Sequence, residues 1–184
     1  MGKISEFCFL SKSSVQILIR TAQRKDAEKI IGINKSILKE EMFMLRNEDE
    51  ADYKTEAVEN DIEHHLLNEG CLYLIAENGD SMAGYLEFSN GIFKKTSHAG
   101  MLQIYLDNKF RGDNIGFELM KTLIKWAEDN PLIEKITLNV FSTNHSAISL
   151  YKKAGFTEEG RCPRDMKFSD GTYADSVLMY RFVK

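Results

Sequence analysis

Apolar residues recur with two different periods in the first half of the chain. Alternation of apolar residues predicts a strand over 15–20, because successive side chains of a strand point to opposite faces. Asp26 precedes apolar residues at helical spacing, which predicts a short capped helix, and a second helix is predicted over 52–68. No such period precedes this region, so residues 1–14 are predicted to be an N-terminal extension.

The middle of the chain has the pattern of a hairpin. Residues 71–76 are apolar and β-favouring, a polar turn with an Asn-Gly pair follows at 77–80, and a second apolar run covers 82–88. This order predicts two antiparallel strands joined by a tight turn. A further strand is predicted over 99–106.

Strands and helices alternate in the second half. Four apolar residues at helical spacing predict a helix over about 115–128, which Asn130-Pro131 ends. The elements predicted after it are a strand over 133–141, a helix over 144–154, and strands over 156–162 and 173–182. These elements predict an α/β (α+β) fold around one mixed sheet, with a parallel crossover near the centre of the sheet.

Composition narrows the classes of function. The chain has 184 residues, a size typical of one domain, and its net charge of −4 argues against a general nucleic-acid binder. Its three cysteines are far apart and form no CxxC pair, so we expect neither a disulfide framework nor a metal site. We find no signal-peptide core and no membrane-spanning run, so we expect a cytoplasmic protein without a membrane partner.

A glycine-bearing stretch follows the strand predicted over 99–106. It reads Arg111-Gly112-Asp113-Asn114-Ile115-Gly116 and leads into a helix. The unpaired N–H groups of a helix N-terminus, together with the helix dipole, form a site for phosphate. By itself the stretch is equally compatible with a plain glycine-rich connection. Its first three residues also spell the integrin-adhesion tripeptide, a function that would require secretion.

A second stretch begins at Asn144 and ends at Phe156. Asn144 is placed to cap a helix, and Tyr151 lies on or near the apolar face of that helix. Periodicity alone favours a buried aromatic at Tyr151 over a catalytic one.

The two stretches together resemble the central motifs of the GNAT superfamily of acyl-CoA N-acyltransferases. The family pattern V-x-P-x-x-[RQ]-G-x-G-[IVL]-G is met except that Asn108 replaces the common proline and Asn114 the middle glycine. If that glycine position needs a positive φ, asparagine is among the few residues that tolerate it. The later pattern N-x-x-A-x-x-[LF]-Y-x-x-x-G-F is met at every specified position.

The resemblance covers about residues 15–183 and implies one N-acetyltransferase domain over 15–184. It implies a mixed, mainly antiparallel sheet of about 6–7 strands flanked by about 4 helices. The implied cosubstrate is acetyl-CoA, and the implied reaction is direct attack by an amine within a ternary complex. Tyr151 matches the tyrosine that protonates the departing thiolate. The residues implied to bind the cosubstrate are Ile104, Tyr105, Leu106, Arg111, Gly112, Asp113, Asn114, Ile115, Gly116, Asn144 and Tyr151.

The base and the acceptor are less specified. Glu87, His98 and the neighbourhood of Gln103 are candidates for the group that deprotonates the amine, and each could equally be a solvated strand position. Residues 40–63 carry ten acidic and two basic residues, a net charge of −8. This segment would attract a cationic amine such as a polyamine, an aminoglycoside or a lysine-rich peptide, or it is simply a solvated helix face.

Two further alternatives remain open from the sequence. The same fold could serve as a catalytically silent acyl-CoA-binding or sensing module. Members of such families are often homodimers, although the sequence shows no distinct interface.

Overall fold

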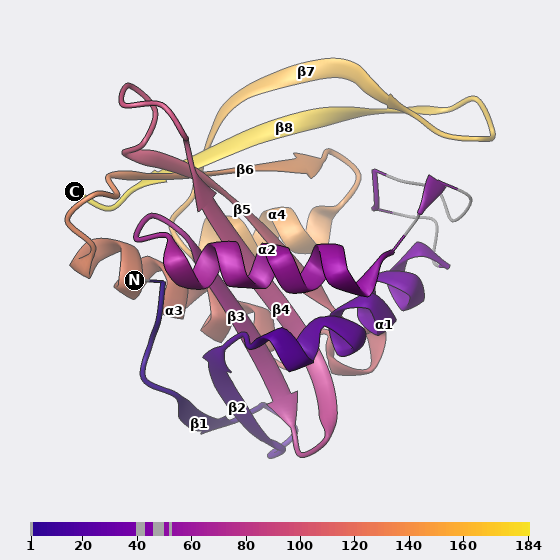
Figure 1. The fold of residues 1–184 in the computed structure, drawn as a ribbon. Coiled ribbons are helices and arrows are strands. Elements are labelled where there is room, and N and C mark those ends of the chain that lie inside the picture. The colour runs from indigo at the N-terminus through magenta and orange to yellow at the C-terminus, as the bar shows by residue number, and fades with distance from the viewer. Residues whose placement is uncertain (1, 40–42, 46–49, 52) are drawn as a thin grey trace.

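One sheet forms the centre of the molecule (Figure 1). The computed structural model describes residues 2–39, 43–45, 50–51 and 53–184. Within them, eight strands pair in the order β1-β2-β3-β4-β5-β6-β8-β7. The strands are β1 (Phe7–Leu10), β2 (Gln16–Thr21), β3 (Leu72–Asn78), β4 (Ser81–Asn90), β5 (Ala99–Leu106), β6 (Lys135–Phe141), β7 (Thr157–Lys167) and β8 (Tyr173–Phe182); the helices are α1 (Ala27–Leu38), α2 (Thr55–Leu67), α3 (Ile115–Asp129) and α4 (His145–Lys153), with short 3-10 turns η1 (Arg24–Asp26) and η3 (Asn108–Phe110).

The predicted class of fold is confirmed. The β5–β6 pair is parallel and the other pairs are antiparallel, including the predicted β3–β4 hairpin. The sheet has one strand more than the 6–7 expected. The extra strand is β1, which pairs with β2 from Phe7↔Ile19 to Leu10↔Gln16. The prediction of no regular element within residues 1–14 was therefore wrong, because a four-residue edge strand is too short to show a period.

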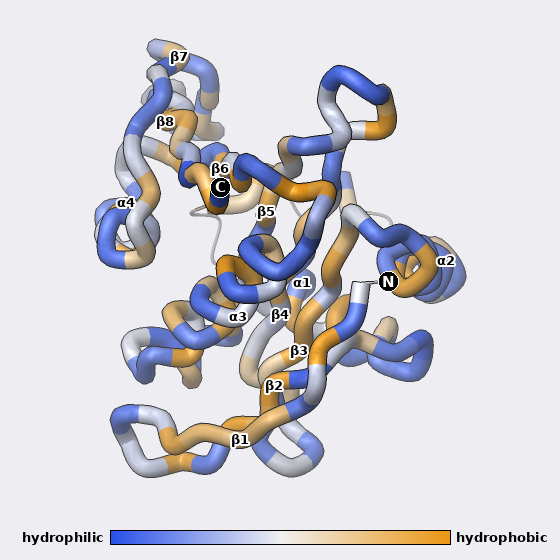
Figure 2. Tube along the Cα trace, turned by 90° about the vertical axis from the view of Figure 1, so that its left-hand side faces the viewer, coloured by the Kyte–Doolittle hydropathy of each residue, from blue (hydrophilic) through white to orange (hydrophobic). Residues whose placement is uncertain are grey.

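The helices cover the two faces of the sheet. Helices α1 and α2 lie on one face and α3 and α4 on the other (Figure 1). The larger core packs beneath α3 and α4, and a smaller one, including Tyr73 and Tyr85, packs beneath α1 and α2. Hydrophobic stretches gather along the central strands, whereas most of the connecting turns are hydrophilic (Figure 2). None of the described helices is long and apolar enough to cross a membrane.

Strands β5 and β6 diverge after a short paired segment. Their register runs only from Ala99↔Lys135 to Met101↔Thr137, although β5 continues to Leu106. Over residues 102–106, β5 is bonded to β4 alone, while β6 remains paired with β8. The sheet therefore opens between its two halves, and alternate backbone N–H and C=O groups of β5 face the opening. We call this opening the β5–β6 slot.

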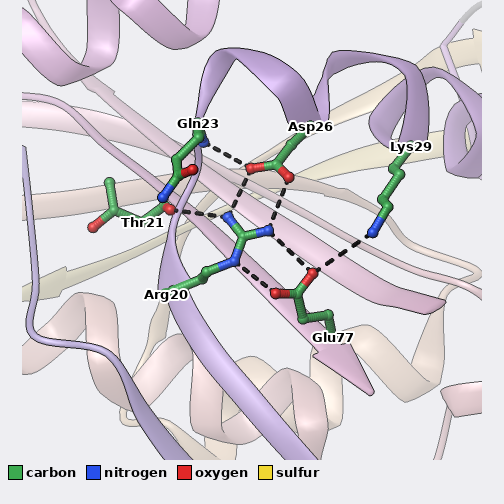
Figure 3. A network of polar contacts seen from close by, with 6 residues as sticks. All are labelled: Arg20, Thr21, Gln23, Asp26, Lys29 and Glu77. Atoms are coloured by element: carbon green, nitrogen blue, oxygen red, sulfur yellow. Dashed lines mark hydrogen bonds and ion pairs between the residues drawn. The ribbon is translucent and has the colours of Figure 1, made fainter. Parts of the chain in front are cut away.

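A buried ion network fixes the start of α1 against the sheet (Figure 3). Arg20 donates two hydrogen bonds to Asp26, at 2.7 and 2.8 Å, and two to Glu77, at 2.7 and 3.0 Å. The Asp26 carboxylate also accepts from the N–H of Gln23 at 2.7 Å. Asp26 was predicted to cap α1, but its side chain makes no such bond. It binds Arg20 and the turn before the helix instead.

Candidate active site

The loop before α3 has the geometry of an anion site. Gly112 and Asn114 have φ values of 77° and 69°, in the left-handed region that glycine and asparagine tolerate. The sequence-based expectation for Asn114 is confirmed. Among the described residues, no atom accepts a hydrogen bond from the backbone N–H groups of residues 112–117. These N–H groups and the dipole of α3 are suited to hold a phosphate.

Both charged side chains of the loop, those of Arg111 and Asp113, form hydrogen bonds with other residues of the protein. Arg111 donates from Nε to the carbonyl of Leu106 at 3.1 Å. Asp113 accepts from the N–H of Ser13 at 2.7 Å and from the Ser13 hydroxyl, and hydrogen bonds from Ser11 and Ser13 lower the pKa of Asp113. The carboxylate that would repel a phosphate is thus bound to the N-terminal segment. Backbone groups therefore carry the anion-binding capacity of the loop.

Two of the predicted binding residues, Ile115 and Gly116, are needed for packing within the protein. The Ile115 side chain is fully buried, so only its N–H group is available to a ligand. A Cβ atom at Gly116 would lie 3.2 Å from the side chains of both Leu106 and Leu150. Glycine at 116 therefore lets the first turn of α3 approach β5 and α4 closely.

Helix α4 places Asn144 and Tyr151 on the α3/α4 face of the sheet. The Asn144 side chain accepts from the N–H of Ala147 at 3.1 Å, so its predicted capping role is confirmed. Tyr151 is 7% exposed and packs beside Phe156. Burial, with a smaller contribution from nearby Tyr105, raises the pKa of Tyr151. The phenol therefore stays protonated over any working pH and can donate a hydrogen bond to a developing thiolate.

Glu87 lies on the opposite, α1/α2 face. It sits across from Tyr73 on β3 and from Gln103 on β5. Burial and the negative charge of Asp61 raise the pKa of the half-buried Glu87 to about 7, although His65 lowers it. A carboxyl group that ionises near neutrality has the property that a general base needs.

Of the candidate bases, the structure distinguishes Glu87 from His98. His98 is exposed before β5, and its carbonyl accepts from the N–H groups of Glu134 and Lys135. Gln103 lies beside Glu87 and accepts a hydrogen bond from the Tyr105 hydroxyl at 2.9 Å. His65 and Ser89 also lie beside Glu87. Sequence reasoning missed both as candidates.

The acidic segment is only partly described. Within it, Glu59 and Glu63 pair with Arg24 at 2.8 and 3.2 Å, and Asp61 lies 3.4 Å from His65. Arg24 therefore compensates part of this negative charge within the protein, which weakens the case for a cationic acceptor. Five residues of the predicted acidic rim lie outside the described residues: Glu40, Glu41, Glu48, Asp49 and Asp52.

A separate groove of about 890 Å³ has no lining residue from β5 or β6 and so lies outside the β5–β6 slot. It runs along α3 between residues 3–7 and residues 153–155. Its charges are largely paired, for example Lys121 with Glu118 at 2.9 Å. Neither Glu87 nor Tyr151 lines it. The β5–β6 slot is therefore the stronger candidate for the site, with Tyr151 on one face of the sheet and Glu87 on the other.

Comparison with known proteins identifies the family of the chain. The acetyltransferase (GNAT) family matches residues 35–156. An N-alpha-acetyltransferase of Sulfolobus acidocaldarius is 28% identical over 92% of this chain and 93% of its own length. The structure of a GNAT acetyltransferase from Streptococcus pneumoniae superposes with a TM-score of 0.85, at 26% identity over 90% of this chain and 99% of that one. The structure of yncA from Salmonella typhimurium with its cofactor acetyl-CoA has the same fold, with a TM-score of 0.80 and 22% identity over 91% of this chain and 94% of that one. Since the family match covers well over half of the sequence, the chain belongs to the GNAT family of acetyltransferases.

Proposed function

We propose that this protein transfers an acetyl group from acetyl-CoA to a primary amine of a small molecule or a protein. One observation carries the proposal: the β5–β6 slot has open N–H groups at its end, a protonated Tyr151 on one face and a Glu87 with a raised pKa on the other. The cosubstrate and the amine would therefore meet from opposite faces, as direct attack within a ternary complex requires.

The backbone supplies binding and polarisation. N–H groups of residues 112–117 would bind the pyrophosphate of acetyl-CoA, and the edge of β5 over residues 104–106 would bind its pantetheine arm. An N–H group of that edge would donate to the thioester carbonyl and stabilise the negative charge that develops on its oxygen.

Side chains supply the proton transfers. Glu87 would remove a proton from the ammonium group of the acceptor, which is needed because only the free amine attacks. Tyr151 would donate to the sulfur of the departing CoA. Burial raises the pKa of Tyr151 and so keeps its hydroxyl protonated. Its hydrogen bond to the sulfur strengthens as negative charge grows there.

Calorimetry and a thiol-release assay test the proposal. Acetyl-CoA should bind in calorimetry, and CoA should be released with one or more members of an acceptor panel. The panel contains free amino acids, peptides with an N-terminal alanine, and spermidine. Absence of binding at millimolar acetyl-CoA would contradict both the enzyme and the sensing module. Binding without CoA release from any acceptor would favour the silent module.

Tyr151→Phe is expected to lower kcat by about 10²-fold near pH 7. The deficit should shrink above about pH 9, because a thiol with a pKa of about 8.5 leaves as its anion without help. A stopped assay of CoA release across pH measures this, and the matched control is Tyr180→Phe on β8. An equal loss at every pH would argue for a packing role of Tyr151.

Asn114→Gly is expected to retain acetyl-CoA binding, and Asn114→Val is expected to weaken it. Glycine tolerates the positive φ at this position, so affinity should be retained. Valine pays about 1–2 kcal/mol in the left-handed region, which corresponds to a roughly 5–30-fold weaker binding or a less stable loop. Calorimetry and urea unfolding of both variants separate these two results. Equal affinity in the two variants would show that binding does not depend on this conformation.

A further inference from the structure

His65 makes a hydrogen bond at each ring nitrogen although it is only 3% exposed. Its Nδ1 lies 2.8 Å from the carbonyl oxygen of Asp61 and 3.4 Å from the Asp61 carboxylate. Its Nε2 lies 2.9 Å from the Ser89 hydroxyl oxygen. A carbonyl can only accept, so Nδ1 carries the proton. In the neutral ring, Nε2 therefore accepts from the Ser89 hydroxyl.

This hydrogen-bonded chain ends beside the proposed base. Ser89 is two residues beyond Glu87 on β4, so both side chains point to the α1/α2 face. The His65 ring packs edge-on against Tyr73, 5.1 Å away, and Tyr73 is the cross-strand partner of Glu87. Ser89 is exposed on this face, whereas His65 is buried behind it.

The groups around His65 favour its protonated form. Hydrogen bonds and charge from Asp61, with a contribution from Glu87, raise the pKa of His65 even though burial, the largest single effect, lowers it. The other ionisable groups described near this point are Tyr73 on β3, Cys71 immediately before β3, and Tyr105 on β5. Burial raises the pKa of both Tyr73 and Cys71. His64, next on α2, contacts the His65 ring edge-on at 5.8 Å.

The reaction requires two protons to leave one nitrogen. A primary ammonium group loses one proton before it attacks and a second as it becomes an amide. Glu87 can accept one of them. Two positions separated by one residue on a strand lie about 6.6 Å apart along the backbone, and their side chains point to the same face of the sheet. An acceptor amine can therefore contact Glu87 and Ser89 together.

We propose that His65 is the second proton acceptor of the acyl-transfer site, and that Ser89 connects it to the amine. This inference rests on the proposed function. The amine passes a proton to Ser89 Oγ as the Ser89 hydroxyl proton moves to His65 Nε2. The imidazolium then returns one proton to solvent beside Asp61, whose side chain is 47% exposed. The lone pair of the free amine forms the bond to the acetyl carbon, and loss of the second proton leaves a neutral amide. The C–S bond breaks in the same sequence, and the departing thiolate takes a proton from Tyr151.

The test compares Ser89→Ala and His65→Gln with His64→Gln, an exposed neighbour on the same helix. Activity is CoA release with the best acceptor of the panel at saturation. Both Glu87 and His65 must be unprotonated, so log kcat of the wild type should fall with a slope of 2 at acid pH. Ser89→Ala and His65→Gln should show a slope of 1 and a kcat at least about tenfold lower. His64→Gln should match the wild type.

Several outcomes would overturn the inference. A wild-type slope of 1, or an unchanged profile in Ser89→Ala, would leave His65 as a residue that only anchors α2 to β4. If His65→Gln does not fold, Ser89→Ala still decides, because it removes one hydroxyl from an exposed position. In an NMR titration, the pKa of His65 should be lower in Glu87→Gln than in the wild type, and an equal value would remove the link between them. A wild type that releases no CoA would contradict the proposed function itself.

Discussion

Glu87→Gln is expected to lower kcat by about 10²–10⁴-fold, the range over which general acid–base catalysis acts. Glutamine keeps the shape of the side chain beside Tyr73 and Gln103 but cannot take a proton. The affinity for acetyl-CoA should be unchanged, because the loop over 111–116 lies at the other end of the β5–β6 slot. CoA release and calorimetry on the same preparation measure both quantities.

The raised pKa of Glu87 also predicts an effect of this substitution on stability. A carboxyl group whose pKa rises from 4.5 to about 7 on folding destabilises the folded protein at pH values above its unfolded pKa. Glu87→Gln should therefore be more stable than the wild type at pH 8 and equally stable near pH 4. Urea unfolding at the two pH values measures this. A variant that is less active and also less stable at pH 8 would contradict burial as the cause of the raised pKa.

Local motifs were predictable because a few consecutive residues determine them. The loop conformation at Asn114 and the cap at Asn144 depend on backbone and side-chain atoms within three or four residues. The same holds for the helices that follow them. Sequence reasoning therefore predicted the loop before α3 and the helix that carries Tyr151, while their roles in binding and catalysis remain proposals.

The α1/α2 face, where we propose that the amine acceptor binds, could not be predicted in the same way. Glu87 was one of several candidate bases, and it stands out only because α2 brings Asp61 and His65 against β4. That contact joins residues more than twenty positions apart. Strand β1 was missed for a different reason, since its four residues are too few to show a period. The point at which β5 and β6 part after Met101 is likewise a property of the folded sheet.

Arg20→Met is expected to cost about 3–5 kcal/mol of the free energy of unfolding, the range for removing one partner of a buried ion pair. Arg20 and Asp26 are almost fully buried, and the substitution would leave Asp26 without its ion-pair partner. Glu77 would keep only the more distant Lys29, at 3.9 Å. Lys125→Met is the control, because Lys125 and its partner Asp129 are both exposed and their pair should leave stability unchanged. If Arg20→Met lowers the free energy of unfolding no more than Lys125→Met does, the network has no stabilising role.

The same network should show in the pH dependence of stability. Hydrogen bonds from Arg20 and Gln23 lower the pKa of Asp26 despite the opposing effect of burial, which is the largest single effect. The stabilisation that comes from the lowered pKa of Asp26 is present above the unfolded pKa of about 4 and is lost as pH falls through the lower folded pKa. Arg20→Met should therefore remove a part of the acid sensitivity of the wild type.

The same network holds helix α1, whose Asn34 accepts a hydrogen bond from the Tyr85 hydroxyl on the α1/α2 face. Arg20→Met should therefore raise KM for the amine more than the Kd for acetyl-CoA.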